Sequence, residues 1–324
     1  MNDSFSRRQF LDASGRLLAG LGTASLLSSR AAAAPASKRL TLATREVLLP
    51  RTPGADCWTV LKSIGAEGVE ATIQEDLSLP ALFHPRRKYT AATPSGIEQL
   101  VDDMKAAGCR ITALCTYNRF DDRPDFEIQW GTKVARAAQA LGAKAVRIDV
   151  VPHKMAAESF LGLCAQTLKR LLQATESTGV AFGIENHGAT TNDPEFLRPL
   201  FERVGSKRLG LTLDTGNFYW YGHPLSKLYE LYEEFATRVF HTHCKSIHYP
   251  AQDRQRRRPI GWEYAKYHCP LDQGDIDFRR VIGILVKAGY QNDLCIEDES
   301  LGKCSPAERI AVLAREVRYL KDLL

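Results

Sequence analysis

The 324-residue chain lacks the close cysteine pairs of redox motifs and structural zinc sites, although it contains 8 cysteines. No two of them stand in a Cys-X-X-Cys arrangement, which argues against a thioredoxin-like centre and against a thiolate zinc site. Cys115, Cys244 and Cys295 fall in predicted strands, where a thiol usually packs as a small apolar group. The other five lie in predicted helices or loops, and an oxidising compartment would permit disulfides among them.

The chain also lacks a strong charge imbalance and, after its first residues, any long apolar run. The net charge is +5, and much of the Lys and Arg is scattered or lies in one loop and the N-terminal segment, so we expect no nucleic-acid partner. No stretch reaches the roughly 20 apolar residues that a membrane-spanning helix needs, so we expect no stable membrane insertion. The balanced composition excludes collagen-like and disordered chains.

The N-terminal segment has the order of a twin-arginine export signal. Ser6-Arg7-Arg8-Gln9-Phe10-Leu11 precedes a mildly apolar run over 17–27, and small residues at 31–36 offer a cleavage site. An amphipathic helix is the alternative, but each of the three glycines in this segment would cost about 1 kcal/mol in a helix interior. The sequence therefore predicts a signal peptide over 1–36, recognition by the twin-arginine export machinery, and a periplasmic or secreted protein.

Short apolar, β-favouring runs alternate with helix-like stretches along the rest of the chain. Strands are predicted at 39–44, 68–71, 110–115, 145–150, 180–185, 210–214, 238–245 and 293–297. Helices are predicted at 55–64, 95–107, 126–141, 157–177, from 194, from 224, and at 277–288 and 306–323. Eight strand–helix units predict the α/β class and a (β/α)8 TIM barrel over 37–324. A doubly wound open sheet is the alternative, but it rarely needs eight such units without a second domain.

Four successive predicted strands end in ionisable residues: Glu185, Asp214, His243 and Glu297. The active sites of such barrels lie at the carboxyl ends of the strands, so we expect these side chains to converge. A single acid at a strand end more often accepts hydrogen bonds from loop amides, whereas four such groups favour a common site. Three carboxylates and one imidazole, without a thiolate, suit a divalent metal ion of intermediate hardness.

Several motifs carry a resemblance to a known family. They are Glu185-Asn-His, Leu213-Asp214-Thr-Gly-Asn217, His241-Thr-His243-Cys-Lys245, Pro270-Leu-Asp-Gln-Gly274-Asp-Ile-Asp277-Phe and Ile296-Glu297. With them the chain resembles the sugar isomerase/epimerase family with a xylose isomerase-like TIM barrel, over nearly all of the chain after the signal.

The resemblance implies that Glu185, Asp214, His243 and Glu297 hold one divalent metal ion and that the two glutamates act as acid and base. The ligand is expected to be His243 because the family's histidine precedes a Lys- or Asn-containing turn. His241 would lie one layer deeper, either as a packed or supporting imidazole or as a ligand. We expect Mn as the metal, with Co, Mg and Zn as alternatives, because folding before export would let a weakly binding ion be enclosed first.

The implied reaction is proton transfer through an enediolate on a keto- or hydroxy-sugar, which gives epimerisation or isomerisation. A metal-dependent lyase acting on an oxidised (3-keto) glycoside is one alternative, and a catalytically silent sugar-binding barrel is another. The similar apurinic-site endonuclease has a histidine where this chain has Asn217, so a trinuclear nuclease site is not expected.

Six further residues are candidates for substrate binding because they lie at or just after predicted strand ends or in the loop after His243. They are His187, Asn217, Lys245, Glu70, Arg147 and Trp262. Glu70 and Arg147 are alternatively expected to form ion pairs at the barrel mouth. The basic run Arg254–Arg258 is predicted to be either a solvated charge run or part of a lid over the site.

Overall fold

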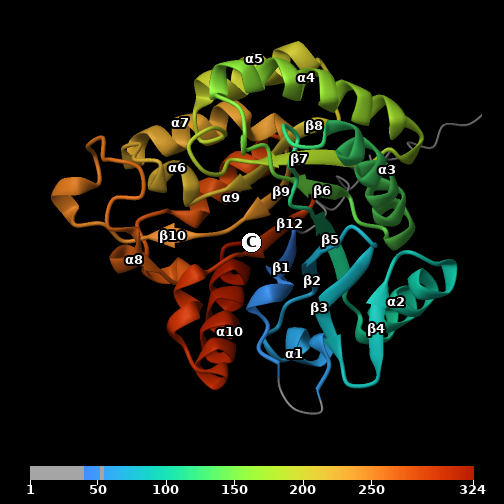
Figure 1. The fold of residues 1–324 in the computed structure, drawn as a ribbon. Coiled ribbons are helices and arrows are strands. Elements are labelled where there is room, and N and C mark those ends of the chain that lie inside the picture. The colour runs from blue at the N-terminus through green and yellow to red at the C-terminus, as the bar shows by residue number, and fades with distance from the viewer. Residues whose placement is uncertain (1–39, 52–54) are drawn as a thin grey trace, which may run out of the picture. The chain divides into compact units, whose positions relative to one another are not determined.

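The computed structural model describes residues 40–51 and 55–324 (Figure 1). Residues 1–36, for which the twin-arginine signal is predicted, lie outside the described residues, and so does residue 39, where the first strand was expected to begin. The predicted barrel region is therefore described almost completely.

Eight parallel strands form the barrel in the order β12-β1-β2-β5-β6-β7-β8-β9. They are β1 (Thr41–Arg45), β2 (Gly68–Thr72), β5 (Arg110–Cys115), β6 (Ala145–Ile148), β7 (Ala181–Glu185), β8 (Leu209–Asp214), β9 (Val239–His243) and β12 (Asp293–Ile296). Figure 1 shows β12, in red, beside β1, in blue, and the two strands pair in parallel. A parallel bridge between Cys244 and Ile296 joins β9 to β12. The predicted (β/α)8 barrel is confirmed.

Helices connect consecutive barrel strands and follow the last one. They are α1 (Cys57–Ser63), α2 (Pro94–Ala107), α3 (Pro124–Leu141), α4 (Ala157–Ala174), α5 (Pro194–Val204), α7 (Leu225–Phe235), α9 (Phe278–Lys287) and α10 (Pro306–Asp322). Two predicted helix starts are confirmed by their caps. Asp193 accepts from the backbone N–H of Glu195 at 3.0 Å, and Asp277 accepts from that of Arg279 at 2.9 Å. Both carboxylates satisfy amides that the first helical turn leaves without intrahelical partners.

The loops at the barrel mouth contain structure that the sequence did not predict. It comprises the hairpin β3 (Ser78–His84) and β4 (Arg87–Thr90), the short helices α6 (Asn217–Trp220) and α8 (Tyr264–Tyr267), and the paired strands β10 (Ser246–Ile247) and β11 (His268–Cys269). Single-turn helices η1–η6 lie at 46–48, 176–178, 236–238, 251–253, 271–273 and 299–303. β3 and β4 pair with each other in the segment between β2 and α2, for which the sequence predicted neither a strand nor a helix. Pro80 is tolerated there because it lies exposed on a two-stranded sheet.

No helix in the described part of the chain is long and apolar enough to cross a membrane. All 8 cysteines are free thiols, and Cys115, Cys244 and Cys295 are buried, as their positions in apolar runs predicted. The disulfides that an oxidising compartment would permit are not formed in this structure.

Candidate metal centre and substrate cavity

The four predicted ligands meet at the carboxyl end of the barrel. Glu185, Asp214 and His243 are the last residues of β7, β8 and β9, and Glu297 directly follows β12. One ligand atom from each of these buried residues lies within 4.8 Å of the other three. The parallel register explains this placement, because Asp214 and His243 are Cα partners across β8 and β9. Residues far apart in the sequence thus form one compact donor group.

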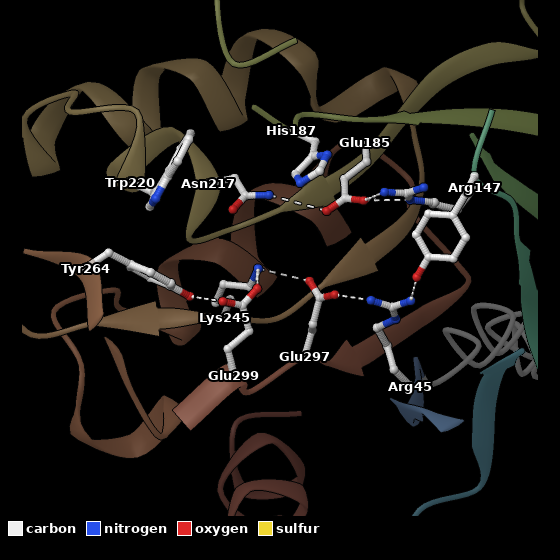
Figure 2. A pocket seen from close by; sticks show the side chains of 11 residues that line it. Arg45, Arg147, Glu185, His187, Asn217, Trp220, Lys245, Tyr264, Glu297 and Glu299 are labelled. Carbon is white, nitrogen blue, oxygen red and sulfur yellow. Dashed lines mark hydrogen bonds and ion pairs between the residues drawn. The ribbon is translucent and has the colours of Figure 1, made fainter. Parts of the chain in front are cut away.

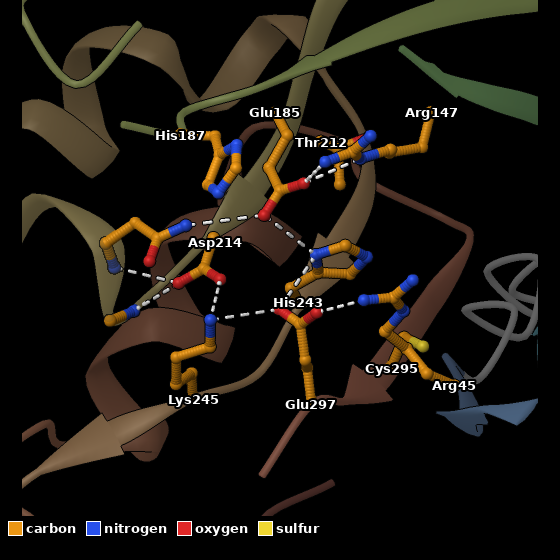
Figure 3. A network of polar contacts seen from close by, with 12 residues as sticks. Arg45, Arg147, Glu185, His187, Thr212, Asp214, His243, Lys245, Cys295 and Glu297 are labelled. Atoms are coloured by element: carbon orange, nitrogen blue, oxygen red, sulfur yellow. Dashed lines mark hydrogen bonds and ion pairs between the residues drawn. The ribbon is translucent and has the colours of Figure 1, made fainter. Parts of the chain in front are cut away.

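The carboxylates of Glu185 and Asp214 each have one oxygen held by the protein and one turned to the common centre (Figure 3). Arg147 Nε donates to Glu185 Oε2 at 2.6 Å, and its Nη2 contacts the same oxygen. Asp214 Oδ1 accepts from the backbone N–H groups of Gly216 and Asn217, each at 2.8 Å. Glu185 Oε1, which accepts from Asn217 Nδ2 at 3.3 Å, and Asp214 Oδ2 are the oxygens that face the centre.

The other two ligands follow the same pattern. His243 Nε2 lies 2.7 Å from Glu70 Oε2, so the ring donates Nε2–H to that carboxylate. His243 Nδ1 then faces Glu185 Oε1 at 3.3 Å and Glu297 Oε2 at 3.1 Å. Glu297 Oε1 is paired with Arg45. Each ligand thus offers a single atom, and neighbouring side chains or backbone amides fix its orientation.

The donor atoms fit a divalent cation. Asp214 Oδ2, His243 Nδ1 and Glu297 Oε2 are buried and have no hydrogen-bond partner among the described residues. Within the described chain, the two carboxylate oxygens share only the Lys245 ammonium, 3.0 Å and 3.1 Å away, and a buried acceptor without a donor, such as His243 Nδ1, costs about 1–3 kcal/mol. A divalent cation between these atoms and Glu185 Oε1 would give all four a positively charged partner. Oxygen donors with one imidazole suit Mn, Co, Mg or Zn. The residues present are those that such an ion requires.

Lys245 lies directly beside the ligands. Its buried Nζ is 3.0 Å from Asp214 Oδ2, 3.1 Å from Glu297 Oε2 and 2.8 Å from Glu299 Oε1. Burial alone would lower the pKa of Lys245, but attraction to Asp214 and Glu297 outweighs it and raises the pKa well above its ordinary value. Lys245 is therefore an ammonium at neutral pH. Glu299 links it to Tyr264, because the Tyr264 hydroxyl donates to Glu299 Oε2 at 2.7 Å.

The three carboxylate ligands differ in their proton affinity. Burial raises the pKa of Glu185, but attraction to Arg147 and His243 outweighs it, so the pKa is lowered. The pKa of Glu297 is lowered in the same way, chiefly by His243 and Lys245. For Asp214, burial outweighs the attraction to Lys245 and raises the pKa to about 7. A cation at the centre would favour the ionised form of Asp214.

A cavity of about 290 Å³ opens over the ligands (Figure 2). Four of the candidate substrate-binding residues line it, namely His187, Asn217, Lys245 and Arg147, together with the ligands Glu185 and Glu297. His187 is exposed, and its Nδ1 lies 3.3 Å from Asp149 Oδ1. The structure thus brings four of the six candidates to one cavity.

Sequence reasoning missed five residues that also line the cavity: Arg45, Tyr117, Trp220, Tyr264 and Glu299. Three of them had a usable signal, because Arg45 ends β1, Tyr117 follows β5 by two residues and Glu299 follows Glu297 by two. All three lie at or just after a strand end or beside a predicted ligand that does. Tyr264 on α8 had a weaker signal, as an aromatic residue in the loop after His243 that was predicted as a possible lid, whereas Trp220 on α6 had none.

Glu70 and Trp262 do not line this cavity. Glu70 is fully buried beneath it and forms its ion pair with Arg45, whose Nε lies 3.2 Å from Glu70 Oε2. Trp262 packs against Tyr249 and Tyr267, with ring centroids 5.6 Å and 5.8 Å away. Glu70 was predicted from its place at a strand end and Trp262 from its place in the loop after β9, but their side chains turn to other partners.

The basic run Arg254–Arg258 partly matches the predicted solvated charge run, because Arg256 and Arg257 are exposed, and none of its residues lines the cavity. Arg258 is only 3% exposed, and its guanidinium lies 4.4 Å and 4.3 Å from the ring centroids of Tyr219 and Tyr249. It donates to the backbone oxygens of Tyr219 at 3.1 Å and His223 at 2.9 Å. The last arginine of the run is therefore a buried structural contact that joins the loop after β9 to α6.

Solved structures share the fold. A protein described as IOLI with a bound zinc atom superposes with a TM-score of 0.64 at 18% identity, over 88% of this chain and 99% of that one. Mannonate dehydratase from Streptococcus suis superposes with a TM-score of 0.63 at 14% identity, over 88% of this chain and 93% of that one. A sugar phosphate isomerase/epimerase from Parabacteroides distasonis superposes with a TM-score of 0.60 at 14% identity, over 89% of this chain and 95% of that one.

In sequence, the chain is 27% identical over 162 residues to MJ1311, an uncharacterized protein of Methanocaldococcus jannaschii. The match spans 49% of this chain and 47% of that protein, so the chain spans about half the length of this curated relative. The family model for the xylose isomerase-like TIM barrel matches residues 58–323, which include all four ligands. The chain therefore belongs to the xylose isomerase-like TIM barrel family.

Proposed function

We propose that this protein is a divalent-metal-dependent sugar isomerase or epimerase that transfers a proton beside the carbonyl group of a keto- or hydroxy-sugar. The observation that carries the proposal is that four side chains each direct one ligand atom to a common centre. The other polar atom of each side chain is hydrogen-bonded or ion-paired to neighbouring groups of the protein. Family membership and the fold shared with a sugar phosphate isomerase/epimerase support it.

The size and lining of the cavity support a small sugar as substrate. A volume of about 290 Å³ lies at the lower end of the range of roughly 300–1,000 Å³ for ligand sites, which suits one sugar ring or its open chain. Tyr117, Trp220 and Tyr264 offer aromatic faces, and His187 and Asn217 offer polar groups. Apolar faces with a few polar groups match the two kinds of surface that a sugar presents.

The chain's own residues account for the proton transfer. A bound divalent ion would supply Lewis acidity towards the sugar oxygens and stabilise the developing negative charge. Glu185 and Glu297 come from opposite sides of the centre, on β7 and after β12, and both reach the cavity. One carboxylate takes the proton and the other returns it, on the opposite face for epimerisation or at the neighbouring carbon for isomerisation. The Lys245 ammonium can donate a hydrogen bond to a substrate oxygen.

A lyase is the second candidate, because the same enediolate expels a leaving group on the adjacent carbon. Lys245 supports this candidate, since its ammonium lines the cavity and offers a proton donor for the leaving group. The fold is also shared with a mannonate dehydratase, a protein named for an elimination. An oxidised (3-keto) glycoside would be the substrate of such a reaction.

One experiment tests both candidates. Protein purified from its own host is analysed for metal content, and keto-sugars and 3-keto-glycosides are then incubated with it in D2O and followed by NMR. We expect about one divalent ion per chain, Mn foremost, and deuterium at a single carbon of an epimer or isomer. An eliminated product would favour the lyase. Turnover without exchange at any carbon would contradict proton transfer through an enediolate.

We further propose that export through the twin-arginine route determines which metal the site holds. This route carries folded proteins, so the site can close on Mn before the chain meets Cu or Zn, which bind such ligands more tightly. Replacing residues 1–36 with a signal that exports unfolded chains should lower the Mn content and activity of the recovered protein. Equal Mn content and activity by both routes would remove this explanation of the signal.

A further inference from the structure

Beneath the metal centre, the interior of the barrel contains three charged or titratable side chains that the proposed reaction does not use. Glu70 on β2, His241 on β9 and Asp293 on β12 are each 0% exposed. The interior of a (β/α)8 barrel is usually filled by layers of branched apolar side chains. Buried carboxylates are costly unless they are paired and hydrogen-bonded, so this group needs an explanation.

The three side chains form a continuous line of contacts that ends at a metal ligand. Asp293 Oδ1 accepts from the Tyr290 hydroxyl at 2.8 Å, and Asp293 Oδ2 lies 2.8 Å from His241 Nδ1. His241 Nε2 is 3.5 Å from Glu70 Oε2. The same Glu70 oxygen accepts from His243 Nε2 at 2.7 Å. The line thus runs from the start of β12 up to the metal centre.

Glu70 reaches two of the four ligands. It contacts His243 directly, and its Oε2 lies 3.2 Å from Nε of Arg45, whose Nη1 is paired with Glu297. When a neutral histidine donates one ring N–H to a carboxylate, its other nitrogen carries no proton, and this is the form that binds a metal ion. The orientation of His243 and, through Arg45, that of Glu297 therefore both depend on this one carboxylate.

We propose that Glu70 is a positioning residue of the metal centre: it holds His243 with Nδ1 towards the ion and steadies Glu297 through Arg45, while His241 and Asp293 hold Glu70 from below. This inference rests on the proposed function, because it requires that the chain bind a metal ion at Glu185, Asp214, His243 and Glu297.

A second metal ion is the competing explanation of the same cluster. Ligand atoms of Glu70, His241 and Cys295 lie within 4.8 Å of one another. Glu70 Oε1 and His241 Nε2 have no hydrogen-bond partner among the described residues. The two explanations differ in their need for Cys295, because a second ion requires its thiolate whereas the positioning of His243 does not. Cys295→Ser is therefore the matched control.

The test is a titration of the metal-free full chain with Mn2+ in competition with a chelator, with bound and free Mn2+ measured by electron paramagnetic resonance. We expect one ion per chain in the unmodified protein and in Cys295→Ser, with equal affinity. Glu70→Gln keeps the shape of the side chain and removes its charge, and should raise the Kd for Mn2+ by about 10–100-fold. In 15N NMR of the protein loaded with diamagnetic Zn2+, His243 should be protonated at Nε2 and bind the ion through Nδ1, and Glu70→Gln should weaken this preference for one tautomer.

Each other outcome has a definite meaning. If the unmodified chain binds no Mn2+, the proposed function fails together with this inference. If it binds Mn2+ and folded Glu70→Gln binds with the same Kd and tautomer, only the positioning role is overturned. Two ions in the unmodified chain and one in Cys295→Ser would make the cluster a metal site instead. If Glu70→Gln does not fold, His241→Gln takes its place: a smaller rise in Kd is expected, and no change overturns the proposal.

Discussion

Replacing Glu185 or Glu297 by Gln is expected to lower kcat by about 10²–10⁴-fold, the usual contribution of a general acid or base. Both carboxylates line the cavity, and each has one oxygen turned to the metal centre while an arginine holds the other. The amide keeps the shape but cannot accept the proton. Rates are measured by NMR with the metal at saturation, so that weaker metal binding is separated from the loss of proton transfer.

Glu127→Gln is the matched control, because Glu127 is a fully buried carboxylate paired with Arg123 on α3, outside the cavity. Its effect on kcat should be small, although its stability can change. If neither ligand variant loses turnover, the two glutamates do not carry the proton transfer. If the unmodified protein binds a sugar without converting it, and Glu185→Gln binds it equally well, the barrel is a silent sugar-binding protein.

Arg147→Met is expected to destabilise the metal-free protein by about 3–5 kcal/mol, the cost of leaving one partner of a buried ion pair alone. Arg147 and Glu185 are 4% and 4% exposed at their side chains, and Arg147 also donates to the backbone oxygen of Thr116 at 2.8 Å. Urea unfolding monitored by circular dichroism measures the change. Added divalent metal should restore part of the lost stability, because an ion that binds the folded state alone stabilises it.

The matched control is Arg198→Met, the same substitution in a surface pair. Arg198 and its partner Glu234 are 41% and 36% exposed, so the expected loss is about 0–1 kcal/mol. Equal losses of unfolding free energy in the two variants would show that burial does not determine how much the Arg147–Glu185 pair stabilises the protein.

The contribution of the Arg147–Glu185 pair should also depend on pH. The pKa of Glu185 is lowered in the folded state from its ordinary value of 4.5, so the folded state binds the proton less readily than the unfolded chain. The stabilisation is therefore present above pH 4.5 and is lost as the pH falls below that value. The difference in unfolding free energy between the unmodified protein and Arg147→Met should shrink in the same direction, and a difference that grows in acid would contradict this assignment.

The sequence by itself determined the barrel and the four candidate metal ligands that converge at its mouth. Parallel strands buried on both faces must be nearly continuous apolar runs, and an ionisable residue that ends such a run stands out from it. Glu185, Asp214, His243 and Glu297 all end such runs, and barrel topology places their strand ends at one mouth. Local patterns therefore sufficed to predict which residues would come together.

Only the tertiary structure decided what surrounds these ligands. Arg45 and Glu297 are separated by 252 residues, and Glu70 and His243 by 173, so no local pattern links them. Trp220 and Tyr264 line the cavity because the short helices α6 and α8 direct them there, whereas Trp262 packs against other aromatic rings. Strand ends are placed by backbone topology, but the direction of a side chain and its choice of partner depend on contacts that exist only after the barrel has closed.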